Sequence, residues 1–135
     1  MNKNILLFAV FALVLFAGSS YSQKLYFCEE YKDATEIGVS STFIITSAGG
    51  YFTCMLDLRD AGKTVETDKI QLVIVDRSYG GYKKVATEPF DVQSEWDYVF
   101  FDKFHTFYTE GYYQVTAETP EGRKIASGYV MVKMK

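Results

Sequence analysis

Few residues of this 135-residue chain have the type and spacing that enzyme chemistry requires. His105 is the single histidine, which excludes histidine-rich metal clusters and leaves one possible base for a catalytic triad. It lies in the aromatic segment 101–107, which we interpret as a connection whose phenylalanines plug the bottom of the fold. An enzyme would instead need His105 in a pocket beside a nucleophile or a carboxylate. No GxSxG, P-loop or zinc-protease motif accompanies it, so we predict no catalytic residue.

Carboxylates are the next candidates, either as a catalytic pair or as calcium ligands. Glu29 and Glu30 are adjacent, and neighbouring residues of a strand face opposite ways, so they cannot form a dyad on one face. Four aspartates fall at or near predicted strand ends, where oxygen ligands could meet a calcium ion: Asp57, Asp60, Asp76 and Asp97. Aspartate is common in turns because it bonds local backbone, and no compact calcium-binding loop is present. We therefore predict no metal and no cofactor.

The two cysteines, Cys28 and Cys54, have a spacing unlike the CxxC motif, which gives no support to redox catalysis or zinc binding. In an exported chain two cysteines are expected to form a disulfide. A bond between Cys28 and Cys54 would stabilise the fold by about 3–4 kcal/mol through the entropy of the unfolded chain.

Aromatic side chains are the most unusual part of the composition. The chain has 23 of them, and 19 remain when the first 22 residues are left out. Tyr79 and Tyr82 flank a pair of glycines, and Trp96 and Tyr98 are predicted to share one face of a strand. Rings of this kind suit glycan stacking or a protein contact because they offer flat area with little entropy to lose. These four residues are the candidate ligand site, while core filling and ordinary exposure are the simpler explanation for aromatic residues in general.

The first 22 residues have the pattern of a cleavable export signal. Lys3 precedes an apolar run from Ile5 to Ala17, which is followed by small residues, and cleavage is predicted before Gln23. The run has 13 residues, fewer than the about 20 that span a bilayer as a helix. We therefore predict a signal peptide over 1–22, no stable membrane span after cleavage, and one domain over 23–135 that is periplasmic or extracellular.

Charge excludes one class of partner. The net charge of the whole chain is −3, and removal of residues 1–22 takes away one lysine and no acid, which leaves −4. Lysine and arginine are dispersed, without the basic stripe that nucleic-acid binding requires, so nucleic acid is not an expected partner.

The apolar residues of 23–135 recur with a period of two, which predicts strands rather than helices. The expected strands are 24–31, 42–46, 51–58, 70–75, 82–86, 90–92, 96–101, 112–118 and 125–134, of which 82–86 and 90–92 are weak. Paired glycines at 49 and 50 predict a hairpin between the second and third of these. Phe52, Cys54, Leu56 and Leu58 should face the core, and 70–75 should be a central strand. With the two weak segments left out or counted as one, these are seven or eight strands with turns between them, which favours an antiparallel two-sheet sandwich.

The segment Phe107–Val115 resembles the corner before strand F of immunoglobulin-like sandwiches, in which a glycine is followed two residues later by a tyrosine. The resemblance implies that Gly111 and Tyr113 form this corner and that the tyrosine hydroxyl bonds nearby backbone. It also implies strand B at 52–58 and strand C at 70–75. The chain departs from the family at Val115, which replaces a cysteine, and it lacks a tryptophan on strand C. The C-terminal third has Gly111, Tyr113 and Val115, followed by Gly122, Lys124 and a final strand that ends in lysine. In these residues it is similar to the sandwich-shaped sorting domains of exported proteins from gliding bacteria.

These observations predict a non-enzymatic, exported binding module whose partner is an unidentified protein or glycan of the cell envelope. One alternative is a self-associating structural component of the envelope, which should show a long bare edge strand. A second alternative is a sorting-type domain, or a small hydrolase or inhibitor.

Overall fold

The computed structural model describes residues 24–135, and within them the fold is all-β, with ten strands and no α-helix. The predicted signal peptide and its cleavage before Gln23 lie outside the described residues. The strands of the two main sheets are β1 (Lys24–Cys28), β4 (Thr42–Ile45), β5 (Thr53–Asp57), β6 (Lys69–Asp76), β7 (Lys83–Asp91), β8 (Tyr98–Phe101), β9 (Gly111–Glu118) and β10 (Lys124–Met134). Strands β2 (Glu30–Lys32) and β3 (Thr35–Ile37) form a separate hairpin, and short 3-10 turns occur at η1 (Arg59–Ala61) and η2 (Ser78–Gly80).

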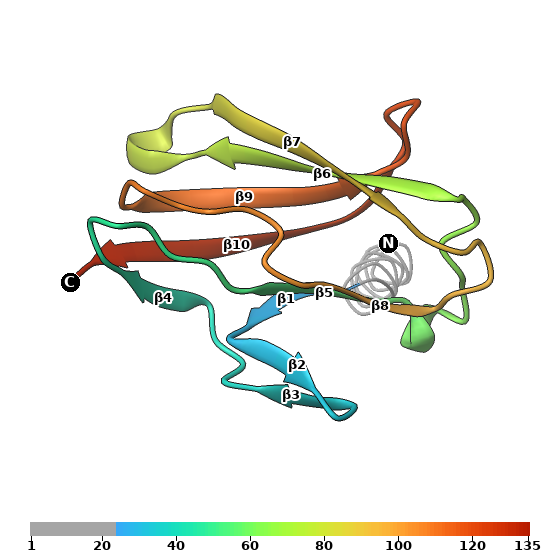
Figure 1. Ribbon diagram of the computed structural model, residues 1–135. Coiled ribbons are helices and arrows are strands. Elements are labelled where there is room, and N and C mark those ends of the chain that lie inside the picture. The colour runs from blue at the N-terminus through green and yellow to red at the C-terminus, as the bar shows by residue number, and fades with distance from the viewer. Residues whose placement is uncertain (1–23) are drawn as a thin grey trace, which may run out of the picture.

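Two sheets form layers that face each other (Figure 1). The larger has the order β4-β10-β9-β6-β7, and the smaller has the order β1-β5-β8. All pairings are antiparallel except one, because β4 runs parallel to the end of β10. The predicted all-β fold with antiparallel sheets is thus confirmed, with one parallel pair that the pattern of residues did not indicate.

Alternating side chains of both sheets fill the interior between the layers. From the small sheet and the segments that extend it the core receives Leu25, Phe27, Phe52, Cys54, Leu56, Leu58, Val99 and Phe101. The large sheet contributes chiefly Ile70, Leu72, Ile74, Tyr113, Val115, Ala117, Val130 and Val132. The predicted inward set of β5 is therefore confirmed, and β6 lies inside its sheet between β9 and β7.

The predicted hairpin at the paired glycines is wrong. β4 belongs to the large sheet and β5 to the small one, so the glycine turn carries the chain from one layer to the other. Gly49 has a φ of +97°, which few residues other than glycine adopt. A Cβ at Gly50 would lie 2.5 Å from Ile45 Cγ2, so only glycine lets the returning chain pass so close to β4.

The predicted disulfide is also wrong, since Cys28 and Cys54 are free thiols. They lie on paired strands, where Cys28 is opposite Thr53 and Cys54 is opposite Phe27. Because successive residues of a strand face opposite ways, Cys54 points into the core and Cys28 points to the outer face of the same sheet. Burial raises the pKa of both thiols, which keeps them protonated and unreactive near neutral pH.

The hairpin β2–β3 lies beside the outer face of the small sheet (Figure 1), an element absent from the sequence prediction. Glu36 of β3 accepts hydrogen bonds from the hydroxyls of Tyr26 in β1 and Tyr98 in β8, the latter at 2.6 Å. Tyr31 of β2 packs on Phe100, with ring centroids 4.6 Å apart. The hairpin is therefore fastened to strands at both edges of the small sheet.

Two further predictions differ in their boundaries. Weak strands expected at 82–86 and 90–92 are one strand, β7, which crosses Pro89 at the edge of the sheet, where proline is tolerated. The strand expected from Trp96 begins only at Tyr98. Within residues 24–135 no helix is long and apolar enough to cross a bilayer.

Candidate functional site

Among residues 24–135 no strand pairs with the outer edge of β4, since β4 is the last strand of the large sheet. The amide of Met131 donates to Ser41 O at 2.8 Å, and the amide of Lys135 donates to Ile45 O at 2.9 Å. In a parallel ladder every second residue of a strand bonds the same neighbouring strand. The bonds to residues 41 and 45 therefore show that the backbone groups of residues 41, 43 and 45 point to β10. The N–H and C=O of Ile44 therefore point away from β10, toward the free edge.

Other backbone groups near this edge already have partners. The amide of Thr42 donates to the hydroxyl of Ser40, and this hydroxyl donates back to Thr42 O, at 3.0 and 2.9 Å. The carbonyl of Thr46 accepts the amide of Gly49 at 2.9 Å. Ile44 is thus the position of β4 at which an additional strand would find a donor and an acceptor together.

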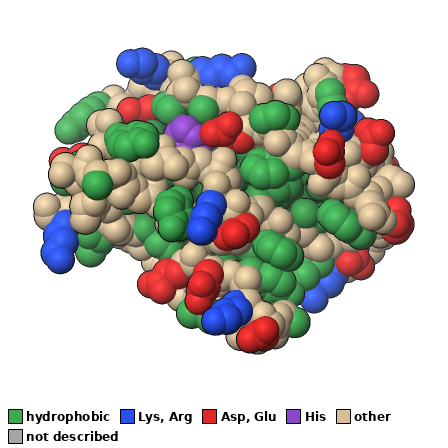
Figure 2. All heavy atoms as spheres, in the orientation of Figure 1, with side chains coloured by type: hydrophobic (Ala, Val, Ile, Leu, Met, Phe, Trp, Pro, Cys, Tyr) green, Lys and Arg blue, Asp and Glu red, His purple; other side chains and the backbone are tan. Residues whose placement is uncertain are grey.

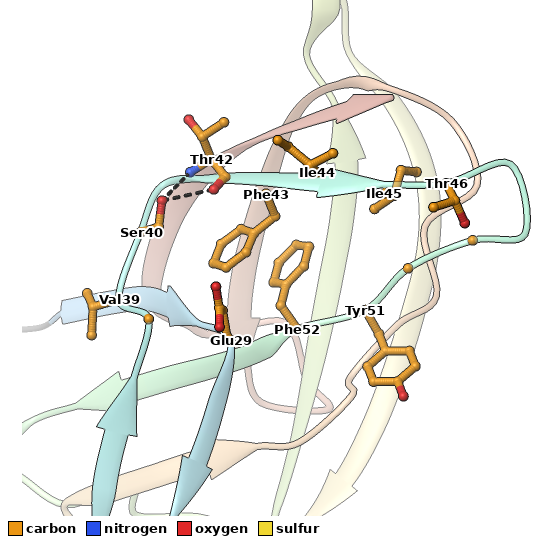
Figure 3. Close-up of a pocket in the computed structure, with 13 residues that line it drawn as sticks. Glu29, Val39, Ser40, Thr42, Phe43, Ile44, Ile45, Thr46, Tyr51 and Phe52 are labelled. Atoms are coloured by element: carbon orange, nitrogen blue, oxygen red, sulfur yellow. Dashed lines mark hydrogen bonds between the residues drawn. The ribbon is translucent and has the colours of Figure 1, made fainter. Parts of the chain in front are cut away.

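A groove of about 600 Å³ lies along this edge, and Figure 3 shows the residues that line it. One wall is β4 and the other is the returning segment 49–52. The floor is the stacked pair Phe43 and Phe52, whose rings lie 4.2 Å apart at an interplanar angle of 7°. Phe43 points into the groove and Ile44 points away from it (Figure 3), as alternation along a strand requires. We call this cavity the β4 groove.

The surface around the β4 groove is apolar, with one charge. Val39, Ile44 and Tyr51 are exposed by 57%, 69% and 54%. Glu29 is the single charged residue among those that line the groove, and its carboxylate lies between the two walls (Figure 3). No cation of residues 24–135 lies within salt-bridge distance of it. An occupant with an apolar face and a positive charge would complement this lining.

The structure separates the four aromatic residues predicted as a ligand site into two pairs. Tyr79 and Tyr82 lie beyond the end of β6, whereas Trp96 and Tyr98 lie beyond the end of β7, which runs antiparallel to β6. Eight residues of β6, at about 3.3 Å each, place roughly 25 Å between these two ends. The four residues therefore cannot form one patch.

Tyr98 has a structural role in a cluster with Tyr26, Glu36 and Arg59, which attaches β3 to the small sheet. Its hydroxyl donates to Glu36, and the guanidinium of Arg59 lies 3.8 Å from its ring centroid. Burial, assisted by the hydrogen bond to Glu36, raises the pKa of Tyr98 to about 12. The same causes raise the pKa of Tyr26 above its ordinary value. Both phenols thus remain protonated donors to one carboxylate at neutral pH.

Trp96 and Tyr82 are exposed in turns, by 40% and 71%. Trp96 lies in the loop before β8, where its amide donates to Gln93 O at 3.0 Å. The guanidinium of Arg77 lies 5.3 Å from the ring of Tyr82. Tyr79 is the most exposed of the four and lines a second cavity together with Tyr112, a residue that sequence reasoning did not select.

His105 has a carboxylate partner, since its Nδ1 lies 2.7 Å from Glu88 Oε2. Glu88 belongs to the edge strand β7 on the side that faces the core, and the histidine ring packs edge-on against Phe107 at 4.8 Å. Glu88 is the carboxylate that an acid–base site would need beside His105, but His105 lines neither the β4 groove nor the second cavity. A charged side chain that points inward from an edge strand discourages that strand from pairing with another chain. The position of Glu88 on β7 fits this role. Figure 2 shows the histidine in purple at the surface.

The predicted plug is present around this histidine, because Phe101, Phe104 and Phe107 are all buried. Two of the four aspartates considered as calcium ligands form ion pairs instead. Asp57 is bound by Arg59 at 2.9 Å, and Asp60 is bound by Lys24 at 2.8 Å. Within residues 24–135 no group of three or more His, Cys, Asp or Glu is arranged to hold a metal ion.

At the corner before β9, the hydroxyl of Tyr113 donates to Thr109 O at 2.7 Å. This is the bond to nearby backbone that the resemblance implied for Tyr113. A Cβ at Gly111 would lie 3.0 Å from Ser78 Oγ and 3.2 Å from the ring of Tyr113, which explains the glycine. Burial raises the pKa of the Tyr113 hydroxyl.

No protein-family model matches the chain, and no curated protein matches it in sequence.

Proposed function

We propose that this chain is an exported, non-enzymatic interaction module that binds an extended segment of a partner protein as an added strand along β4. The observation that carries the proposal is the free donor and acceptor of Ile44 at the edge of an apolar groove. Strand addition to a sheet edge uses backbone hydrogen bonds for affinity and pockets for alternate side chains for specificity. The β4 groove offers both.

The occupant's side chains would alternate as those of β4 do. One set would enter the groove and rest on Phe43 and Phe52, and the other would lie beside Ile44 on the outer surface. A lysine or arginine of the occupant would meet Glu29. The volume of about 600 Å³ is within the range of ordinary ligand pockets.

An immunoglobulin-like architecture is part of the proposal and is supported by the order of the strands. In that family strands A, B and E share one sheet, and C, F and G share the other. Here β1, β5 and β8 share one sheet, while β6, β9 and β10 are neighbours in the other. Tyr113 near the start of β9, with its hydrogen bond to Thr109, corresponds in this proposal to the tyrosine of the corner before strand F.

Export is supported by the residues of 1–22 alone, which combine a lysine, a 13-residue apolar run and small residues before Gln23. A partner in the periplasm or outside the cell follows from this proposal. The net negative charge of the chain favours a partner segment that carries basic residues. Lysine and arginine are dispersed among acids on the face in Figure 2, which gives no support to nucleic acid as the partner.

The test is selection of peptides from a random 12-residue library on the protein over residues 23–135, followed by affinity measurement on two variants. Ile44→Pro removes the free N–H and adds a ring at the edge, where proline is compatible with folding. Ile44→Ala keeps the backbone and removes most of the side chain. We expect alternating apolar peptides with a basic residue, at least about tenfold weaker binding to Ile44→Pro, and little change for Ile44→Ala.

The same bare edge could accept β4 of a second copy, which is the self-associating alternative. Sedimentation over a range of concentrations distinguishes the two. A wild-type chain that forms oligomers while Ile44→Pro stays monomeric would replace the partner segment by a second copy. A monomeric wild-type chain that selects no peptide, or peptides that bind Ile44→Pro equally well, would overturn strand addition along β4.

A further inference from the structure

The turn between β6 and β7 displays a tyrosine over a second cavity, of about 450 Å³. Its polar and aromatic lining comes from η2, from Glu110 before β9, and from β9 and β10, and the apolar residues of β10 complete it. The lining residues are Ser78, Tyr79, Glu110, Gly111, Tyr112, Met131, Val132, Lys133 and Met134. It shares no lining residue with the β4 groove. We call it the tyrosine cavity.

The turn that carries Tyr79 is firmly attached to β9. The amide of Arg77 donates to Tyr112 O at 2.7 Å, and the hydroxyl of Ser78 accepts the amide of Tyr112 at 3.0 Å. Asp76 Oδ1 accepts the amide of Ser78 at 2.9 Å. These bonds fix the backbone on both sides of the cavity, so the position of Tyr79 is set by the turn.

Tyr79 itself gives nothing to the packing of the fold. Its side chain is fully exposed, and its backbone has φ 56° and ψ 32°, the left-handed region that a tyrosine adopts at a cost. Glycines occupy the next two positions, yet position 79 is not a glycine. A bulky ring kept in a conformation that favours glycine points to binding as its purpose, since strained residues concentrate at ligand sites.

A second aromatic ring, that of Tyr112, also lines the tyrosine cavity. Tyr112 stacks on Tyr129 of β10, with centroids 5.4 Å apart and planes 11° from parallel. Both rings are partly exposed, by 39% and 45%. This stacking fixes the orientation of Tyr112 and leaves ring surface available to a ligand.

The charges of the cavity favour a neutral polar ligand. Glu110 and Lys133 both line it, and neither forms an ion pair with another residue of 24–135. A carboxylate accepts hydrogen bonds and an ammonium donates them, so together they match hydroxyl groups, which do both. A strongly acidic or basic ligand would be repelled by one of the two.

We infer that the tyrosine cavity binds a carbohydrate, in the form of a β-linked oligosaccharide with equatorial substituents. The C–H face of such a pyranose is flat and packs on the electron-rich face of an aromatic ring. Its hydroxyls then reach Glu110 and Lys133. The volume of about 450 Å³ suits a small ligand of this kind. An added strand finds no free edge here, because β9 and β10 both lie inside the sheet.

The experiment is an NMR titration of the ¹⁵N-labelled protein with cellotetraose and chitotetraose, which are β-1,4-linked, and with the α-linked maltotetraose. We expect saturable shifts for the β-linked sugars, confined to residues 78–80, 110–112 and 131–134, and weak or absent shifts for maltotetraose. No shifts with the β-linked sugars at about 10 mM, or equal binding of maltotetraose, would overturn the inference.

Two variants distinguish loss of a direct contact with the sugar from a general effect of removing an exposed tyrosine from this turn. Tyr79→Gly removes the ring and suits the left-handed backbone, so binding should weaken at least about tenfold while Tm does not fall. Tyr82→Ala removes an exposed tyrosine of the same turn that does not line the cavity, and binding should be unchanged. Equal losses in the two variants, or full binding by Tyr79→Gly, would contradict the assignment. Ile44→Pro should bind the sugars normally, so this test and that of strand addition fail independently.

Discussion

Replacement of Tyr113 by phenylalanine measures what the hydrogen bond of the corner before β9 contributes to the free energy of unfolding. The ring is 4% exposed and packs against Phe107 at a centroid distance of 4.9 Å, and phenylalanine preserves these contacts. What is lost is the 2.7 Å hydrogen bond to Thr109 O. A hydrogen bond of this kind contributes about 1 kcal/mol net, and about 2 kcal/mol if the carbonyl stays away from water. For a domain of about 110 residues, 1 kcal/mol lowers Tm by about 4 °C.

Urea denaturation of wild type and Tyr113→Phe is the appropriate assay, with the free energy of unfolding taken from the midpoint at a constant slope. Tyr112→Phe is the matched control, because this neighbouring ring is 39% exposed and its hydroxyl has no protein partner among residues 24–135. We expect a loss of about 1–2 kcal/mol for Tyr113→Phe and less than about 0.5 kcal/mol for the control. A loss for Tyr113→Phe that does not exceed the control would refute the reasoning about the corner.

Three other predictions concern stability. Because Cys28 and Cys54 are free, a reducing agent should leave Tm unchanged and the intact mass should correspond to two thiols; a mass two hydrogens lower would contradict this. Because the pKa of Tyr98 rises from 10.0 to about 12 on folding, the folded state holds its proton more tightly, so stability should be complete below about pH 10 and fall between pH 10 and 12. Tyr98→Phe should reduce this loss when the free energy of unfolding is measured by urea denaturation between pH 10 and 12. An unchanged pH dependence would contradict the role given to Tyr98 in its cluster with Tyr26, Glu36 and Arg59. Phe52→Ala should cost about 3–5 kcal/mol in the same urea assay, since Phe52 is 1% exposed among four other phenylalanines.

Local patterns sufficed for the parts of the fold that depend on alternation. The inward set of β5 follows from a period of two, and so do the opposite faces of β9. The corner at Gly111 and Tyr113 is implied by the resemblance to immunoglobulin-like sandwiches, and its sequence pattern is local because Tyr113 bonds Thr109, only four residues away. Such features need no knowledge of which strands meet.

The rest depends on contacts between residues far apart in the sequence. The parallel pairing of β4 with β10 joins 42–45 to 131–134, so the free edge of Ile44 could not be located from the residues around it. The disulfide prediction failed for a related reason, since the faces of Cys28 and Cys54 are set by the register of β1 on β5. Glu88 of β7 meets His105, which lies in the connection between β8 and β9, and no local pattern indicates this pairing.

Tyr112 begins a strand that the sequence predicts, 112–118, but it is not part of the predicted site. The alternation of 112–118 indicates that Tyr112 and Tyr113 lie on opposite faces of the strand, and in the structure Tyr113 is buried and Tyr112 is exposed. What could not be foreseen is that Tyr129 of β10 stacks on Tyr112 and that Tyr79 of η2 lines the same cavity as Tyr112. Strand order supplies this kind of information, and the alternation of residues does not.

Hydrogen exchange at the amide of Ile44 tests strand addition most directly. In the free protein this N–H points away from β10 and should exchange quickly, while the amide of Met131, bonded to Ser41 O, is protected. With a selected peptide present at saturation, exchange at Ile44 should slow by at least about tenfold and exchange at Met131 should change little. An Ile44 amide that exchanges equally fast with and without bound peptide would contradict the proposed function.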